Sequence, residues 1–363
     1  MKKMIALIAL LWGVFTVQIA LAELPAVTEN LTPEAAKNFA VGRLEGGYSL
    51  IDVQNGGRFL LIPEGMDAPD DLDADITPLY MPLDNLLVAS TSTVALMDEI
   101  GALSAVAQTT YDAEDWYLPD VKQAVQDGRI AYVGSYKQPD FERIALNPPK
   151  LAVFSTMIDG TPDVREKLDE LGIPVLVDSS ALEDTPLGRM EWMKLYGVLL
   201  GHEDAANAAF EAQKQKIKTL EPMQENVTVA MFYITSKGAL YVRNNGDYMV
   251  KMLELAGGQY TPEGLDDGES GTRQMEMEAF YLAAGDADCI LYIGQLGGRP
   301  ETLSQLLERN ALLADFKAVQ TGRVYCTGAD YFQQAGRLGD LIEDMNRMLS
   351  GDDAVLTHIM KLE

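Results

Sequence analysis

Histidine is nearly absent from this sequence: among 363 residues only His202 and His358 occur. Both fall at polar helix ends rather than beside a candidate nucleophile, so no Ser/His/acid or Cys/His arrangement can be assembled. A site for a bare zinc or manganese ion would need clustered histidines and carboxylates, so the scarcity argues against that as well. Glycine-rich phosphate loops are also missing. The sequence favours a binding protein without a resident cofactor over an enzyme.

Cysteine is equally scarce, with Cys289 and Cys326 alone. Each lies in an apolar, strand-like run, where a lone thiol is commonly a small core residue. A single disulfide between the two is the alternative. No cysteine stands near the N-terminus, so the acylated anchor of bacterial lipoproteins is not expected.

Long apolar runs are confined to the N-terminus. Lys2 and Lys3 precede an apolar run over residues 4–20, and small residues at Ala20 and Ala22 suit a signal peptidase. We expect residues 1–22 to be a signal peptide cleaved after Ala22. No later run approaches the ~20 apolar residues of a membrane span, so the mature protein is expected to be soluble and periplasmic.

Basic residues are in deficit: 28 lysines and arginines stand against 55 aspartates and glutamates, for a formal net charge of −27. Such a balance argues against nucleic acid as a partner. Most of the excess is expected to form a solvated surface, which keeps an exported protein soluble. We expect a monomer.

The longest helical signal covers residues 185–222. Thr185 can cap the first helix, Pro186 fits its first turn, and Gly201 suits a left-handed end, after which a second helix begins. On both sides the chain alternates strand-like and helical segments, which predicts parallel sheets covered by helices. The expected fold is α/β, with two Rossmann-like lobes at 83–184 and 223–363 and a rigid helical bridge between them. The alternative is a helical hairpin inside one large domain.

An extension at residues 23–82 precedes the first lobe. Two apolar runs flank Asn55-Gly56-Gly57, which predicts a β-hairpin. Residues 23–40 are polar enough to suggest an irregular lead-in, and the acidic, proline-containing residues 64–82 suggest a loop.

Candidate ligand contacts lie where strands end, because ligands of open α/β sheets gather beyond the carboxyl ends of the strands. Hydroxyls, amides, a cation and tyrosines there would orient a bulky, partly anionic organic ligand. Arg189, on the first turn of the bridge, either points into the cleft or forms a structural ion pair. Many of the strand-end residues could equally cap helices and turns. The candidates are Ser92, Tyr136, Ser155, Thr156, Met157, Arg189, Tyr233, Arg243, Asn244, Gln295 and Tyr331.

Four runs carry a family resemblance: residues 142–155, 168–201, 256–260 and 312–328. They resemble the periplasmic binding proteins of ABC importers for ferric siderophores, haem and cobalamin. The resemblance covers roughly residues 80–351 and implies two α/β lobes, a rigid helical bridge and a cleft that closes slightly. It implies a metal complex as the ligand and delivery of that ligand to an inner-membrane permease.

The resemblance also implies a docking role for one acid on each lobe. Glu142 fits the family position well, whereas Glu278 lies ten residues before Asp288 and Glu142 only eight before Lys150, so the pairing is less regular. Both acids could instead stabilise the first turns of their helices. Two other functions stay open at this point: a cofactor-handling enzyme or chelatase, and a ligand sensor with the same cleft.

Overall fold

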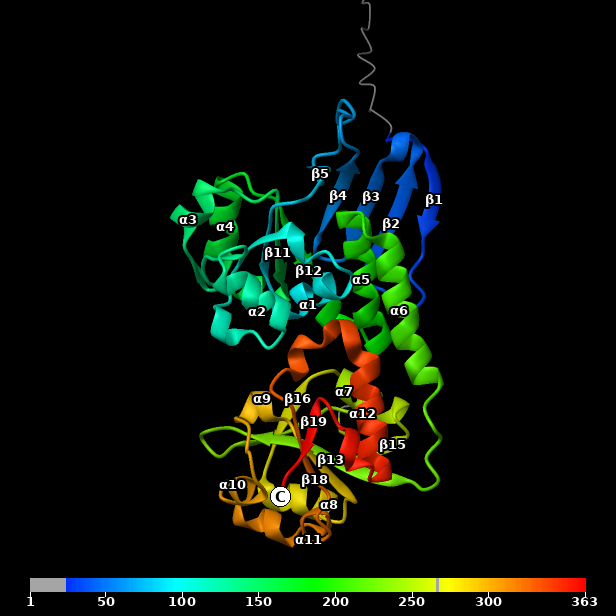
Figure 1. The fold of residues 1–363 in the computed structure, drawn as a ribbon, viewed down its shortest axis with the longest axis vertical. Coiled ribbons are helices and arrows are strands. Elements are labelled where there is room, and N and C mark those ends of the chain that lie inside the picture. The colour runs from blue at the N-terminus through cyan, green and yellow to red at the C-terminus, as the bar shows by residue number, and fades with distance from the viewer. Residues whose placement is uncertain (1–23, 266–267) are drawn as a thin grey trace, which may run out of the picture.

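The protein is described here by a computed structural model, which covers residues 24–265 and 268–363. The expected signal peptide and its cleavage site lie outside the described residues. Within the described part, no helix is both long and apolar enough to cross a membrane. Figure 1 shows an upper part that carries a small N-terminal sheet and the first lobe, and a second lobe below it.

The N-terminal extension is a complete five-stranded sheet rather than a hairpin alone. Its strands follow the order of the chain, with a parallel pair only at the last position. The predicted hairpin is its centre, with Asn55 at φ 58° in the turn. The predicted lead-in and loop are wrong in part, because each contains a strand; the first of these has exposed side chains and so shows no apolar alternation. The strands are β1 (Val27–Leu31), β2 (Phe39–Leu44), β3 (Ser49–Val53), β4 (Gly57–Ile62) and β5 (Ile76–Tyr80).

The first lobe is built on a parallel sheet, as predicted. Its strand order is β12 (Val175–Asp178), β11 (Leu151–Ser155), β6 (Leu86–Ala89), β7 (Val106–Thr109) and β8 (Ala131–Tyr132). Every neighbouring pair is parallel, so all five carboxyl ends meet at one edge. The remaining elements are β9 (Gly134–Ser135), β10 (Gln138–Pro139), α1 (Thr91–Glu99), α2 (Pro119–Gln126), α3 (Phe141–Leu146) and α4 (Pro162–Glu170).

The second lobe has a mixed sheet of seven strands. Four are mutually parallel: β15 (Gly258–Thr261), β13 (Val227–Ile234), β17 (Cys289–Tyr292) and β18 (Val324–Thr327). Three others run antiparallel to their neighbours: β14 (Leu240–Arg243), β16 (Thr272–Met275) and β19 (Ile359–Lys361). The helices are α7 (Tyr248–Leu255), α8 (Met277–Ala284), α9 (Gly294–Gly297), α10 (Leu303–Leu307), α11 (Lys317–Gln320) and α12 (Leu338–Ser350).

The two cysteines lie on neighbouring strands of this sheet. In the register of these two strands Cys326 lies opposite Tyr292, and Tyr292 comes three residues after Cys289. An odd offset places the two side chains on opposite faces, and each thiol packs in a different core cluster. Burial raises the pKa of Cys289 to about 11 and that of Cys326 to about 12. Both are free core thiols, because a disulfide needs the two Cβ atoms side by side.

The bridge consists of α5 (Pro186–Leu200) and α6 (Glu203–Lys218). Thr185 caps α5 by accepting from the Gly188 N–H at 3.0 Å, and Gly201 ends it at φ 72°. The helices form a tight hairpin, since a Cβ on Gly197 would lie 2.8 Å from that of Ala206. α5 lies in the upper part and also contacts α7 and α12 of the second lobe, while α6 continues down to that lobe (Figure 1).

Contacts of α6 with α12 fix its lower end. Gln213 accepts from the Asp340 N–H at 3.2 Å, and Lys216 pairs with the Asp340 carboxylate. The crossing helix is therefore packed against α5 of the upper part and α12 of the second lobe. This packing is the physical reason to expect that the lobes move little against each other.

Two buried carboxylates attach the N-terminal sheet to this scaffold. Glu191 accepts hydrogen bonds of 2.8–2.9 Å from three consecutive backbone N–H groups of residues 34–36, and from Lys194 Nζ at 2.9 Å. Glu183 accepts from the next two N–H groups, of residues 37 and 38, and from Trp192 Nε1, each at 2.9 Å. These contacts, hereafter the carboxylate clamp, satisfy five successive donors of an irregular segment.

Candidate ligand-binding cleft

A cavity of about 400 Å³ opens between the two lobes. The first lobe contributes the segments that follow β6, β7, β11 and β12, together with the start of α5. The second lobe contributes the start of α7 and the segment between β18 and α12. The lining side chains are Ser90, Thr91, Ser92, Tyr111, Ser155, Thr156, Met157, Ser180, Ala181, Arg189, Tyr248, Tyr331, Phe332, Ala335 and Leu338.

The hydroxyls at the strand ends of the first lobe mainly cap helices. Ser90 Oγ accepts from the Thr93 N–H at 3.3 Å and lies 2.9 Å from Ser92 Oγ. Ser155 Oγ accepts from the Met157 N–H at 3.4 Å. Each hydroxyl keeps donor or acceptor capacity that faces the cavity. The capping alternative and a ligand contact are thus compatible for these residues.

Arg189 is the cation of the cleft. Its guanidinium stacks 3.8 Å from the centre of the Tyr248 ring, so a residue of α5 meets a residue of the second lobe. It also donates to the backbone carbonyls of Ala181 and Glu183. No ion pair joins it to a carboxylate within the described ranges, so the structural ion pair that the sequence allowed is not formed there, and its side chain lines the cavity. Burial lowers the pKa of Arg189, although it stays a cation at neutral pH.

The floor on the second lobe is polar and buried. Tyr331 is 2% exposed, and its hydroxyl has no hydrogen-bond partner in the described part of the chain. Burial raises the pKa of Tyr331 and of Tyr248, so both phenols are protonated donors at neutral pH. A buried donor without a protein acceptor is costly unless a ligand or water accepts from it.

Arg243 lies beneath this floor rather than in the cleft. Its guanidinium is 3.6 Å from Asp247, and its Nε and Nη2 have no hydrogen-bond partner among the described residues. The Asp247 carboxylate also accepts from the N–H groups of Met249 and Gly271. Arg243 therefore adds positive charge under the phenols of Tyr248 and Tyr331 without lining the cavity.

Apolar and aromatic groups make up much of the remaining wall. Met157 is 55% exposed at the rim, and Tyr111, Phe332 and Leu338 complete the surface. A cation, protonated phenols and apolar faces together suit a ligand with both anionic and apolar parts.

Four other predicted contacts lie outside the cavity. Tyr233 stacks on Tyr241 at 5.2 Å, because β13 and β14 form an antiparallel pair and these two residues face each other in it. Asn244 donates to the carbonyl of Ser270, and Gln295 accepts from Thr327 Oγ1. Tyr136 packs against a core cluster of the first lobe.

The lining residues that the sequence did not single out are chiefly Tyr111, Tyr248, Phe332 and Leu338. Tyr111 lies two residues after the end of β7, whereas Tyr248, Phe332 and Leu338 lie farther from any strand end. The only sequence signal for the group was the resemblance over the neighbouring segments.

The segment 331–337 also holds the lobes together beside the cleft. Gln333 Oε1 accepts from the Tyr117 N–H at 2.9 Å, and Gln333 Nε2 donates to the Asp115 carbonyl at 2.7 Å. Arg337 pairs with Glu99 of α1. The segment that contributes Tyr331 and Phe332 is therefore fixed to the first lobe.

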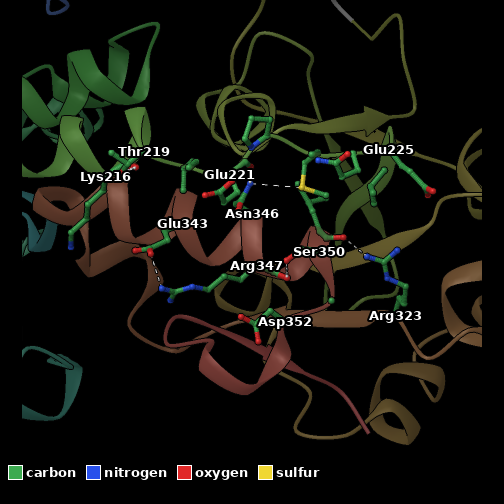
Figure 2. A pocket seen from close by; sticks show the side chains of 17 residues that line it. Lys216, Thr219, Glu221, Glu225, Arg323, Glu343, Asn346, Arg347, Ser350 and Asp352 are labelled. Carbon is green, nitrogen blue, oxygen red and sulfur yellow. Dashed lines mark hydrogen bonds and ion pairs between the residues drawn. The ribbon is translucent and has the colours of Figure 1, made fainter.

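A larger cavity of about 890 Å³ lies elsewhere, between the end of α6, residues 219–225 and the last turns of α12. Its cations are engaged: Figure 2 shows Arg347 paired with Glu343, at 2.6 Å. Arg323 donates to the carbonyls of Met348 and Leu349 at 3.3 and 2.7 Å. This cavity shares no residue with the interlobe cleft.

Comparisons with known proteins place the chain. A family model described as periplasmic binding protein matches residues 87–331. An uncharacterised lipoprotein of Methanocaldococcus jannaschii is 29% identical over 300 residues, covering 79% of this chain and 70% of the relative. A second one from the same organism is 26% identical over 333 residues, 87% of this chain and 83% of the relative. The latter match exceeds the two lobes and so includes part of the N-terminal sheet.

Solved structures share the fold at low identity. A periplasmic haem-binding protein of Pseudomonas aeruginosa has a TM-score of 0.58 at 19% identity, covering 77% of this chain and 98% of that one. An ABC-type Fe3+-hydroxamate transport protein of Saccharomonospora viridis has 0.58 at 20%, covering 78% and 96%. The petrobactin-binding protein YclQ of Bacillus subtilis has 0.60 at 16%, covering 82% and 95%.

The family model spans both lobes and the bridge from β6 to Tyr331. The expected α/β fold is confirmed, and so is a binding protein rather than an enzyme, because the family consists of solute-binding proteins. The chain belongs to the periplasmic binding protein family.

Proposed function

We propose that the protein captures a chelated iron compound, haem or a corrinoid in the interlobe cleft and delivers it to the permease of an ABC importer. Structural neighbours named for haem, ferric hydroxamate and petrobactin support a ligand of this class. The cavity of about 400 Å³ lies within the usual range of about 300–1,000 Å³ for small-molecule sites.

The observation that carries the proposal is Arg189, a half-buried cation without a carboxylate partner among the described residues, stacked on Tyr248 beside the unpartnered phenol of Tyr331. An anionic oxygen of the ligand would neutralise the guanidinium and accept from the phenol. Siderophores with carboxylate or catecholate oxygens and haem with its propionates carry such groups, and a corrinoid with a nucleotide loop carries an anionic phosphate.

A preformed complex fits the cleft better than a free ion. Hydroxyls, phenols and a guanidinium line it, and these are groups that orient an organic ligand. The described residues hold no group of three or more His, Cys, Asp or Glu side chains placed to share a metal ion. The iron would arrive with its own ligands.

Docking to the permease is assigned to Glu142 and Glu278. Both are exposed, on the first turns of α3 and α8, one on each lobe. Neither carboxylate has a hydrogen bond or ion pair within the described ranges. Pairing with arginines of two permease subunits would affect encounter rate and salt dependence more than ligand affinity.

Thermal unfolding against a ligand panel tests the ligand class. The panel holds catecholate, carboxylate and hydroxamate ferric siderophores, haem and cyanocobalamin, with zinc and manganese chlorides as the free-ion arm. A ligand that binds only the folded protein raises its melting temperature by mass action. We expect at least one iron complex or haem to do so. Stabilisation by a free ion alone would contradict the proposal.

A further inference from the structure

Helices α3 and α8 occupy equivalent places in the two lobes. β11 lies beside and parallel to β6, the first strand of its lobe, and β17 lies in the same way beside β13. α3 directly precedes β11 and α8 directly precedes β17. α8 has eight residues and α3 six, so the additional two residues stand after the shared first turns. This length accounts for the unequal spacing from Glu142 and Glu278 to the following strands.

The two helices correspond residue by residue from their first turns. Ile144 and Phe280, each two positions after the acid, are both 0% exposed and anchor their helices to a core. The acids themselves are exposed in both. Because the buried positions match, the two helices present the same face to solvent.

Each of these faces carries a leucine four residues after the acid. Leu146 is 87% exposed and Leu282 is 86% exposed; the next large apolar side chain among the described residues, Leu182, is 58% exposed. Side chains four residues apart on a helix are neighbours, so each leucine lies beside its acid. A single exposed leucine needs no explanation. Here, however, the two most exposed large apolar side chains of the described residues occupy equivalent positions on the two lobes, and that coincidence needs one.

We infer that Glu142 with Leu146, and Glu278 with Leu282, form two copies of one docking surface, in which each leucine is buried by the partner. This rests on the proposed function. The repetition fits a partner with two equivalent subunits, each presenting a cation for the acid beside an apolar recess for the leucine. A permease built from two copies of one membrane subunit would present such a site twice. Side chains that become fully buried at the centre of an interface contribute more to binding than those at its rim, and charges guide the encounter.

The test uses the full-length protein, its ferric or haem ligand from the panel, and the permease–ATPase complex purified from the source organism in liposomes. Stimulation of ATP hydrolysis is titrated with parent, Leu146→Ala, Leu282→Ala and the double variant. Alanine favours helices and both leucines are exposed, so folding is retained. Leu171→Ala and Leu255→Ala are the matched controls, since these leucines are 40% and 42% exposed on the same two lobes.

We expect the double variant to need about tenfold more protein for half-maximal stimulation, a shift of about 1.4 kcal/mol. Each single variant should show about half of that free-energy shift. Ligand affinity should stay within about twofold of the parent. An unchanged titration overturns the inference, as does an equal shift in the control variants. A parent dimer that the double variant disperses, seen by analytical ultracentrifugation, overturns it too. A parent that binds no panel ligand and never stimulates the complex instead refutes the proposed function.

Discussion

Charged side chains are compensated in two different ways within residues 183–191, which lead into the first turns of α5. Glu191 and Glu183, in the carboxylate clamp, have every nearby donor arranged around them. Arg189, between them in the sequence, has two carbonyls and an aromatic ring but no described carboxylate. A buried charge whose hydrogen-bond partners all lie in the protein stabilises the fold. A buried charge without an opposite charge in the protein can be neutralised by a ligand, as we propose for Arg189. The comparison separates the part of the molecule built for stability from the part built for binding.

The largest effect is expected from breaking the clamp. Glu191→Ala would leave three backbone N–H groups without their acceptor and Lys194 with only its longer ion pair to Glu34, at a cost of about 3–5 kcal/mol in unfolding free energy. Chemical denaturation measures it. Glu211→Ala, which removes an exposed acid from α6, is the control and should change stability by less than about 0.5 kcal/mol. A loss below about 1 kcal/mol in Glu191→Ala would show that the clamp is not structural.

Removing the cation of the cleft should weaken ligand binding strongly and change the stability of the fold little. Arg189→Ala is expected to weaken binding of the best panel ligand about tenfold to a hundredfold, the range for a hydrogen bond to a charged group. Its stability should change by about 1 kcal/mol or less, because no ion pair is broken. Calorimetric titration gives the affinity, with Arg129→Ala on the surface as control. Unchanged affinity would remove Arg189 from the site.

Tyr331→Phe tests the same contrast between stability and binding by removing a single oxygen atom from the cleft. The phenol hydroxyl is buried without a described partner, so its loss should leave the unfolding free energy unchanged or raise it by up to about 1 kcal/mol. Ligand affinity should fall about threefold to tenfold, as for one neutral hydrogen bond. Denaturation and titration of the same sample provide both values. A fall in stability beyond about 1.5 kcal/mol would mean that the hydroxyl already has a partner in the free protein.

The smallest effect concerns His358, whose Nδ1 lies 2.7 Å from Asp330, the residue before Tyr331. Burial lowers the pKa of His358, but the hydrogen bond with Asp330 and the negative charges of Asp330, Asp344 and Asp340 together outweigh it, so the pKa lies above 6.5. Burial likewise raises the pKa of Asp330, and its hydrogen bond with His358 leaves it below 3.8.

The sign of the pH dependence follows from these directions. The contribution of His358 is fully present below pH 6.5 and is lost as the pH rises through its folded pKa; that of Asp330 is lost as the pH falls below 3.8 through its folded pKa. His358→Asn should therefore lose about 1 kcal/mol or less at about pH 5 and almost nothing at about pH 9. Denaturation at both pH values checks this. An equal loss at both would contradict it.

Local sequence signals predicted the scaffold because they depend on near neighbours. The start of α5 is marked by Thr185 and Pro186 and its end by Gly201, all within or next to the helix itself. The central strands are marked by their own apolar runs. The parallel first lobe also brought its strand ends to one edge, which is why Ser92, Ser155, Thr156 and Met157 were found.

The missed features depend on pairings between distant parts of the chain. Nothing local tells that β14 runs antiparallel to β13, which sets Tyr241 opposite Tyr233. The clamp joins Glu191 to residues more than 150 positions earlier. Tyr248 and Phe332 reach the cavity only because the second lobe packs over the first. Such contacts follow from tertiary packing, which a local pattern does not encode.

Hydrogen–deuterium exchange with and without the best panel ligand tests the central claim most directly, because it observes both regions at once. We predict new protection in residues 90–92, 155–157 and 331–335, on both lobes of the cleft, and no change in residues 27–62 of the clamped sheet. Protection confined to residues 219–225 and 346–352, around the larger cavity, or an unchanged cleft, would contradict it.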